Sequence, residues 1–365
     1  MSLFSPWGIF CFNLAFGLVL GCMLYRGDFC IAGILRDQFL FHDRTLLRPL
    51  LLAIGLTLIF FTLARYAGLV PTTPPAVFGP PSLAGSAGGW LFGLGMVLAG
   101  GCVVSTLYKL GSGNLSHGIA FVGIIAGSVL YAEFQSLFDL LHQSGRFTQA
   151  SLLRQHWAQG SELLEISLML LTIGYLIYWY RSGLLQVTAA AEAYLQPWKI
   201  AVGLALLNLT AYLINGWPLG ISTAYLKIGL WLEALVLPTH ALQAHSVVQQ
   251  SRIVIMPFAG AVSDHYLVTE LPFMVGIIGG AMMTALVLKE FRVYGLPPWR
   301  QGVAAFSGGV VMALGARLAN GCNIKFMLGG LPLLSLEALL FVPGMILGAW
   351  FGAKLLPFVI TPSRY

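Results

Sequence analysis

Charged side chains are scarce in this sequence. Only 9% of its 365 residues are Asp, Glu, Lys or Arg, whereas 58% are hydrophobic and the mean hydropathy is +0.84. Soluble domains carry about a quarter charged residues, so this composition excludes an ordinary soluble domain and predicts an integral membrane protein. The net charge of +6 comes from basic residues spread singly between apolar runs. This spread fits the positive-inside bias of membrane proteins better than it fits nucleic-acid binding.

Cysteines are also few, and their spacing does not suggest a metal site or a disulfide framework. There is no C-x-x-C pair and no His/Cys pair at zinc-ligand spacing, and the five cysteines are Cys11, Cys22, Cys30, Cys102 and Cys322. We therefore expect free thiols within the membrane, with no metal and no cofactor. No ATP-binding motif occurs. Residues 1–25 contain no Lys or Arg, so we expect the first apolar run to stay as a helix rather than be cleaved as a signal peptide.

Long apolar runs are what the sequence has in abundance. A membrane-spanning helix needs about 20 mostly apolar residues. Nine runs qualify: 5–25, 46–69, 87–108, 115–138, 162–180, 199–217, 271–289, 301–321 and 333–356. Three shorter segments, 29–41, 219–236 and 251–266, are predicted to be amphipathic or re-entrant. The predicted fold is an all-α integral membrane protein with about nine spanning helices plus short re-entrant or half helices.

The distribution of basic residues predicts the orientation in the membrane. The first connection, 26–48, contains four arginines, whereas the stretch 70–89 carries no charge. The positive-inside rule then places 26–48 in the cytoplasm and 70–89 outside. Counting onward, 139–161 lies outside, the N-terminus outside and the C-terminus inside. We expect a multi-pass protein of the cell inner (plasma) membrane.

One eight-residue pattern occurs twice. Residues 95–102 (GMVLAGGC) recur as 315–322 (GARLANGC), with five of the eight positions identical. In the predicted orientation the helix ending at Cys102 runs inward and the helix ending at Cys322 runs outward. We therefore expect two inverted repeats, 1–195 and 196–365, integrated in one transmembrane domain. In transporters of this type the substrate site lies where the repeats meet.

Cys102 and Cys322 are the first candidates for a transport pathway. Each follows a glycine, Gly101 or Gly321, and each is followed by polar residues. Polar groups at membrane depth usually line a pathway, although a lone buried cysteine is also a common packing residue. Cys30, in the sequence RGDFC, is a weaker candidate taken alone. A neutral thiol is a weak donor and a polarisable acceptor, so it holds a soft sulfur atom without trapping it, as conduction requires.

Basic and polar residues near these thiols complete the candidate site. A cation within a membrane run is costly and usually has a partner, which for Arg317 and Lys325 is either an anion or the carboxylate of Glu337. Asn114 fits a helix N-cap and equally fits an anion cradle. The candidate pathway residues are Cys30, Cys102, Cys322, Arg26, Gly101, Asn114, Arg317, Gly321, Asn323 and Lys325.

Four motifs follow one another in a specific order. They are Arg26…Phe29-Cys30, Gly100-Gly101-Cys102 with Gly111-Ser112-Gly113-Asn114, Gly216-Trp217-Pro218-Leu219-Gly220-Ile221, and Gly315-Ala316-Arg317-Leu318-Ala319-Asn320-Gly321-Cys322-Asn323. This set resembles the YeeE/YedE family of inner-membrane transporters over about residues 10–356. The resemblance implies transport of sulfur compounds, with thiosulfate uptake as the characterised activity, through an inverted-repeat fold with short helices that do not span the membrane.

The resemblance also implies a mechanism. Three pathway cysteines carry over as Cys30, Cys102 and Cys322, and the thiosulfate ion passes between these neutral thiols through S–H···S contacts. The chain is then a transporter rather than an enzyme. It supplies sulfur for assimilation, and a cytosolic sulfur-carrier protein is the implied partner. Val103 and Val104 after Cys102, and Lys325 close after Cys322, depart from the expected pattern. These departures, and a selenium-associated branch of the family, leave a selenium oxyanion or another sulfur species open as substrate.

Two other functions are compatible with the residues. A membrane thiol–disulfide oxidoreductase needs two cysteines whose Cα atoms lie about 5.5–6 Å apart, and the absence of C-x-x-C counts against it. A transporter of a soft metal such as Cu(I) would use the cysteines and the 11 methionines. Methionine in apolar runs is usually core filler, however, and the nearby basic residues disfavour a cation.

Overall fold

The computed structural model describes residues 6–70, 78–184, 194–236, 254–256, 260–262 and 264–360. In this part of the chain the secondary structure is helical apart from one small antiparallel ribbon, which pairs β1 (Val254–Met256) with β2 (Gly260–Val262). Nine helical segments among the described residues are long and apolar enough to cross a membrane. The structure therefore confirms the predicted all-α membrane fold.

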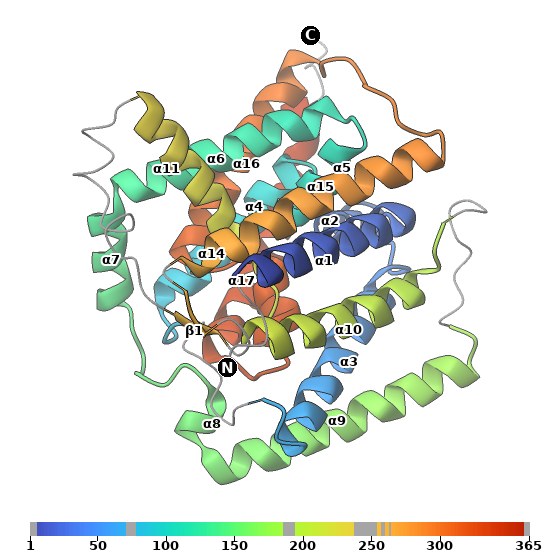
Figure 1. The fold of residues 1–365 in the computed structure, drawn as a ribbon, viewed down its shortest axis with the longest axis vertical. Helices are drawn as coiled ribbons and strands as arrows, with labels where there is room; N and C mark the ends of the chain where they lie inside the picture. Colours follow the sequence, from blue (N-terminus) through green and yellow to red (C-terminus); the bar gives the residue numbers. More distant parts are fainter. Residues whose placement is uncertain are drawn as a thin grey trace.

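Long and short helices follow one another in the same order in both halves of the chain (Figure 1). The first half reads long, short, long, long, short, long: α1 (Pro6–Gly27), α2 (Ile31–Phe41), α3 (Leu47–Tyr66), α4 (Leu83–Leu98), α5 (Val103–Gly111) and α6 (Leu115–Glu133). The second half repeats this order: α10 (Pro197–Asn215), α11 (Ser222–Val236), α15 (Glu270–Val287), α16 (Trp299–Leu318), the π-helix η1 (Lys325–Gly330) and α17 (Leu336–Ile360). A short helix, α14 (His265–Val268), precedes α15, and the halves are joined by α7 (Gln135–Ser144), α8 (Leu153–His156) and α9 (Ala158–Arg181).

Helices of the two halves pack against each other rather than forming separate bundles. The most extensive contacts join α1 to α15, α4 to α17, and α16 to both α4 and α6. Each such contact has a counterpart with the halves exchanged: α1 on α15 corresponds to α10 on α3, and α4 on α17 corresponds to α16 on α6. The short helices α2, α5 and η1 lie inside this framework, and α11 enters it with its N-terminal half, while its C-terminal half is exposed.

Glycines allow the long helices to approach until their backbones touch. A Cβ atom on Gly93 of α4 would lie 2.0 Å from the Met345 carbonyl oxygen, and one on Gly348 of α17 would lie 2.0 Å from the Trp90 carbonyl oxygen. Small residues are the usual contact residues between membrane helices, because lipid offers no hydrophobic force that drives such helices together. This close packing explains the high glycine content of the chain.

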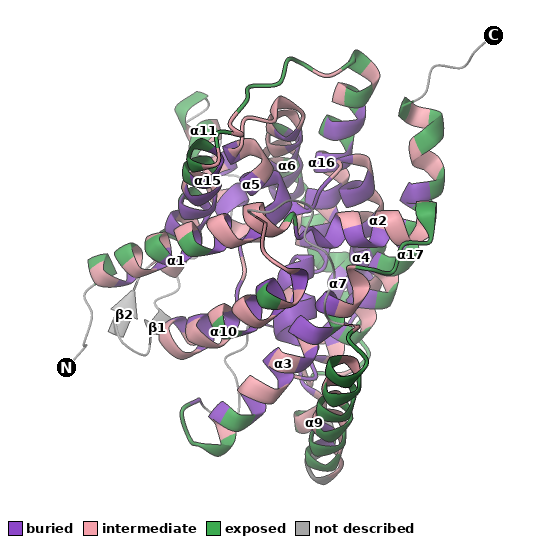
Figure 2. Ribbon diagram, turned by 90° about the vertical axis from the view of Figure 1, so that its right-hand side faces the viewer, coloured by how far each residue is buried: buried purple, intermediate pink, exposed green. Residues whose placement is uncertain are grey.

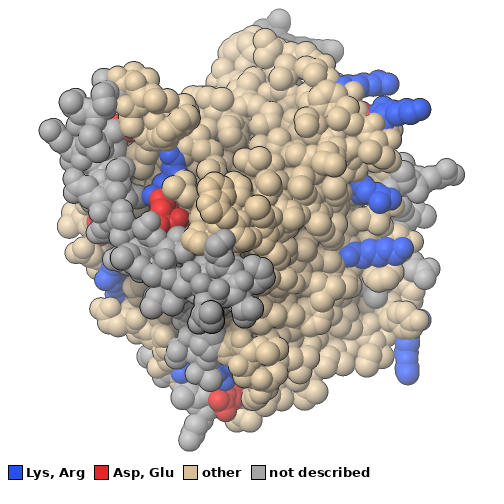
Figure 3. All heavy atoms as spheres, in the orientation of Figure 1, with Lys and Arg blue, Asp and Glu red and all other residues tan. Residues whose placement is uncertain are grey.

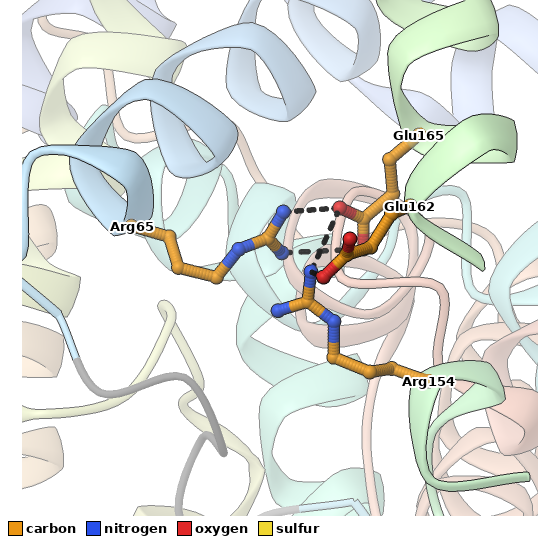
Figure 4. A network of polar contacts seen from close by, with 4 residues as sticks. All are labelled: Arg65, Arg154, Glu162 and Glu165. Carbon is orange, nitrogen blue, oxygen red and sulfur yellow. Dashed lines mark hydrogen bonds and ion pairs between the residues drawn. The ribbon is translucent and has the colours of Figure 1, made fainter. Parts of the chain in front are cut away.

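Buried residues gather around the short helices, whereas α9 is exposed along most of its length (Figure 2). Ion pairs fasten this peripheral helix to the rest of the fold (Figure 4). Arg65 on α3 makes a bidentate ion pair with Glu165 on α9, whose side chain is only 3% exposed. Arg154 on α8 adds contacts to Glu162 at 3.2 Å and to Glu165 at 3.7 Å. Two cations and two carboxylates thus compensate one another at one end of α9.

Two predictions from the sequence need correction. The predicted run 87–108 is not one helix, because it breaks after Leu98 and restarts at Val103. The predicted re-entrant segment 251–266 contains the β1–β2 ribbon, and helix begins again only at His265. Val254 and Ile255 are β-branched residues that favour a strand, so a short apolar run was misread as a membrane segment.

Candidate functional site

The repeated sequence pattern folds into the same turn twice. The Gly101 N–H donates to the Met96 carbonyl at 3.0 Å, and the Gly321 N–H donates to the Ala316 carbonyl at 2.8 Å. The preceding residue is left-handed in both turns, with φ of 74° at Gly100 and 57° at Asn320. Glycine and asparagine are the residues that most readily adopt this conformation at a helix end. The two copies of the sequence pattern therefore adopt the same backbone structure.

All three candidate cysteines stand at the start of a short helix. Cys30 is the N-cap of α2, where its sulfur accepts a hydrogen bond from the Gly33 N–H at 3.4 Å, and Cys102 is the N-cap of α5. Cys322 precedes the helical segment that begins at Asn323, and the amides of Ile324 and Lys325 face its sulfur. Unpaired N–H groups give a helix N-terminus a partial positive charge. Each thiol thus lies where an anion is stabilised.

Cys30 and Cys102 meet although they are 72 positions apart in the sequence. Their side chains are hydrogen-bonded to each other, and the Ser105 side chain contacts both. The two cysteines are 5% and 3% exposed and Cys322 is fully buried. All five cysteines are free thiols. The structure therefore brings two of the three candidate thiols into direct contact.

Tyr225 connects the surroundings of Cys102 with those of Cys322. This fully buried side chain on α11 lies within electrostatic range of both thiols. Its hydroxyl donates to the carbonyl of Val103, directly after Cys102, at 2.6 Å. Sequence analysis did not select Tyr225, because an aromatic residue in a short apolar segment carries no signal beyond packing.

Arg317 and Lys325 are both half-buried and both bind backbone carbonyls. Arg317 donates to the carbonyl of Ser222, and Lys325 donates to the carbonyl of Asn320. The Lys325 ammonium also lies over the Phe78 ring, 5.5 Å from its centroid. Among the carboxylates, Glu337 has the largest electrostatic effect on the Lys325 ammonium, as the sequence suggested. Each cation therefore binds a backbone carbonyl at a turn where a helix is interrupted in the membrane core.

For Arg317 the acidic neighbour is Glu270, which sequence analysis missed. Glu270 is 8% exposed, and its Oε2 accepts hydrogen bonds from the N–H groups of Thr223 at 2.8 Å and Ala224 at 2.9 Å. The N-terminus of α11, the fourth short helix, is thus occupied by a carboxylate of the protein itself. A small pocket opens beside it, lined by Asn13, Asn215, Trp217, Pro218, Leu219, Gly220, Thr269, Glu270 and Phe273.

The remaining predicted residues are spread over the site. Asn114 caps α6, with its side chain accepting from the Ser116 N–H at 3.1 Å, and it lies about 13 Å of helix beyond Cys102. Arg26 is in the last turn of α1, and its carbonyl accepts from the Leu195 N–H at 2.8 Å. Asn323 is fully buried beside Cys322. Within the described residues, no three His, Cys, Asp or Glu side chains gather in a way that would hold a metal ion.

Comparison with known proteins gives a consistent family. Thiosulfate transporter TsuA of Spirochaeta thermophila is 29% identical over 359 residues, which cover 94% of this chain and 98% of the relative. Thiosulfate transporter TsuA of Escherichia coli is 27% identical over 363 residues, covering 96% and 95%. Probable transporter YedE of Salmonella typhimurium is 37% identical over 92 residues, covering 24% and 23%. Residues 26–351 match the family model described as sulphur transport, and the chain therefore belongs to this family.

Proposed function

We propose that this protein carries thiosulfate into the cell by passing it between the neutral thiols of Cys322, Cys102 and Cys30. The observation that carries the proposal is the position of these three cysteines, each at the N-terminus of a short helix within the membrane-spanning framework. The full-length relatives named thiosulfate transporters support this choice of substrate.

The chemistry of the site suits an ion with two different ends. Thiosulfate has a soft terminal sulfur, which a thiol contacts through a weak S–H···S bond, and a sulfonate end that carries charge. Helix N-termini and the cations Arg317 and Lys325 offset that charge in the membrane core. No single contact is strong, so the ion is stabilised at each thiol without being trapped there.

We further propose that residues 1–195 and 196–365 are inverted repeats. Three observations support this: the shared order of long and short helices, the packing contacts that exchange halves, and the identical turns before Cys102 and Cys322. In this arrangement α4 and α16 run in opposite directions through the membrane, and the pathway lies between the repeats.

We place the Cys30 end of the pathway at the cytoplasmic side of the inner membrane. Basic side chains gather along one edge of the molecule (Figure 3). At this edge α1 ends, α10 begins and α15 ends (Figure 1). Arg26, Lys199 and Lys289 lie at these helix ends. On the proposed outer side, Arg65 at the end of α3 and Arg154 on α8 are paired with carboxylates, so these arginines add little to the charge difference between the two sides of the membrane.

Labelling of introduced cysteines tests the orientation and the inversion together. Leu83 at the start of α4 is 60% exposed, and Trp299 at the start of α16 is 73% exposed. In a Cys11→Ala background, we expect a membrane-impermeant maleimide to label Leu83→Cys on intact cells and Trp299→Cys only after permeabilisation. The background without an introduced cysteine is the control. Labelling of both positions from the same side would contradict the inverted repeat.

Uptake of labelled thiosulfate tests the substrate. In cells that lack their own sulfate and thiosulfate importers, we expect expression to give uptake above the empty-vector control, growth on thiosulfate as the sole sulfur source, and label in cysteine. The proposed cytosolic acceptor, a sulfur-carrier protein, rests on the family resemblance alone. Stronger competition by selenite or sulfite than by unlabelled thiosulfate would reassign the substrate. No uptake by a well-expressed protein would refute thiosulfate transport.

One observation favours a second candidate function, a membrane thiol–disulfide oxidoreductase. The hydrogen-bonded side chains of Cys30 and Cys102 are the kind of pair that such an enzyme needs. The two candidates differ in what they require of Cys322. A relay needs all three thiols, whereas a redox pair needs only the two that touch.

A further inference from the structure

His117 lies directly over the turn that leads into Cys102. It is near the start of α6, and its side chain is 8% exposed. A Cβ atom built on Gly101 would be 3.5 Å from the imidazole Nε2, and one built on Gly100 would be 3.8 Å from Cε1. The Nε2 edge of the ring therefore faces the Gly100–Gly101 turn.

The imidazole has hydrogen-bonding capacity that the protein does not use. Neither ring nitrogen has a hydrogen-bond partner among the residues that the structure describes. The hydroxyl of Thr106, fully buried one turn after Cys102, is also without one. Burying an unsatisfied polar group costs free energy, so such groups are rare unless a ligand or water completes them. These two groups, one facing the Gly100–Gly101 turn and one a helical turn after Cys102, leave hydrogen-bonding capacity for a polar ligand.

The side chains that pack against Gly101 are polar. Besides His117 Nε2, the nearest atom to a Cβ built on Gly101 is the Ser105 Oγ, at 2.6 Å. The Ser105 side chain also contacts the thiols of Cys30 and Cys102. Lys109 and Arg36 lie within electrostatic range of the imidazole, so the potential here favours an anion. The Ser105 hydroxyl donates to the Cys102 carbonyl at 3.1 Å, so the imidazole is the side chain at this turn whose hydrogen-bonding capacity is unused.

The equivalent space in the second half is built differently. A Cβ atom on Gly321 would meet the Lys325 Cδ at 2.7 Å and the Phe326 ring at 2.8 Å. The two turns have the same backbone hydrogen bonds, so these side chains mark a real chemical difference. Beside one turn lies a lysine whose ammonium is bound to the Asn320 carbonyl, and beside the other lies an imidazole ring whose nitrogens have no partner among the described residues. Discrimination between ligands by shape and hydrogen bonding therefore belongs to the His117 turn.

We propose that His117 binds the sulfonate end of thiosulfate while the Cys102 thiol contacts its terminal sulfur, which makes His117 a specificity-determining residue. This inference rests on the proposed function. A single N–H on Nε2 donates to a sulfonate oxygen, and Ser105 lies beside the same ligand. A sulfur anion that lacks the oxygens leaves the imidazole unsatisfied and pays the cost of that buried group.

Four variants test this role in the full-length protein. His117→Phe keeps a planar ring without a donor, His117→Gln places an amide nitrogen near the position of Nε2, and His117→Asn places one near Nδ1. His142→Phe is the matched control, since His142 is another buried histidine, packed against Ser82 at the start of α4. Uptake kinetics, membrane expression and the thiosulfate-dependent rise in melting temperature of purified protein are measured for each.

Loss of a hydrogen bond to a charged ligand weakens binding by about tenfold or more. We expect His117→Phe to raise the KM for thiosulfate by at least that factor with a Vmax within about twofold of wild type, and to abolish the melting-temperature rise. We expect His117→Gln to recover most of the affinity, whereas His117→Asn does not and His142→Phe behaves as wild type. An unchanged KM in His117→Phe, or equal losses in the Gln and Asn variants, overturns the proposal. If wild type itself neither binds nor transports thiosulfate, the proposed function fails first.

Discussion

Replacing Cys30, Cys102 or Cys322 singly by alanine is expected to reduce thiosulfate uptake by at least tenfold while the protein still reaches the membrane. Each thiol lies at the N-terminus of a short helix, where we propose that it contacts the soft end of the ion. Alanine leaves an apolar surface there, and about 1.4 kcal/mol of lost stabilisation at one position slows passage tenfold. Uptake of labelled thiosulfate, corrected for expression, measures the effect.

The chain supplies its own controls for this experiment. Cys11 is exposed on α1, and the Cys22 thiol donates to the Gly280 carbonyl at 3.3 Å, so Cys11→Ala and Cys22→Ala are expected to transport at wild-type rates. Cys322→Ala separates the two candidate functions. Normal activity of this variant, together with loss in Cys30→Ala and Cys102→Ala, would support the oxidoreductase. Normal uptake by all three variants would show that these cysteines are packing residues.

Gly101→Ala is expected to reduce uptake by at least tenfold without unfolding the protein. The added methyl group would lie 2.6 Å from the Ser105 Oγ and 3.5 Å from the His117 Nε2, in the space where the ion is proposed to bind. Gly101 does not share the left-handed backbone of Gly100, so alanine fits its conformation. The methyl group would displace the Ser105 hydroxyl and narrow the proposed binding position, and Vmax and KM for thiosulfate are the quantities to measure.

Two further glycines distinguish this blockage from a folding defect. Gly174 on α9 has no atoms within 4 Å of a built Cβ, so Gly174→Ala is expected to leave both uptake and melting temperature unchanged. Gly100 has φ of 74°, so Gly100→Ala strains the turn and is expected to lower the melting temperature. Gly101→Ala with wild-type uptake would mean that the ion does not pass over this turn.

The helical framework could be predicted from the sequence because hydrophobic length directly reports membrane spans. The predicted run 199–217 corresponds to α10 and 333–356 to α17, each within a few residues. The break inside 87–108 was harder to place, since Gly100 and Gly101 fit either a closely packed helix or a turn. Tertiary packing decides between them, through the ring of His117 and the hydroxyl of Ser105 that fill the space beside the turn.

The site itself was only partly predictable, because its contacts join residues far apart in the chain. Cysteine chemistry identified Cys30 and Cys102 separately, but only the packing of α2 against α4 and α17 brings them together. Glu337 was the expected partner because few acids occur in the apolar runs. Glu270 lies just before the predicted run 271–289, so the sequence suggests only a charged residue at a helix end. Its role depends on α11 beginning beside it, which no local pattern reveals.

The Glu270 carboxylate of α15, bound at the N-terminus of α11, makes the proposed pathway asymmetric. Three short helices present thiols, whereas the fourth already holds the carboxylate of Glu270 at its N-terminus and has no need of a visiting ion. On the proposed relay, the four short helices of the two proposed repeats would offer three binding positions for the ion. The free-energy profile along the proposed pathway would then be asymmetric, so that capture at one end and release at the other would depend on different residues.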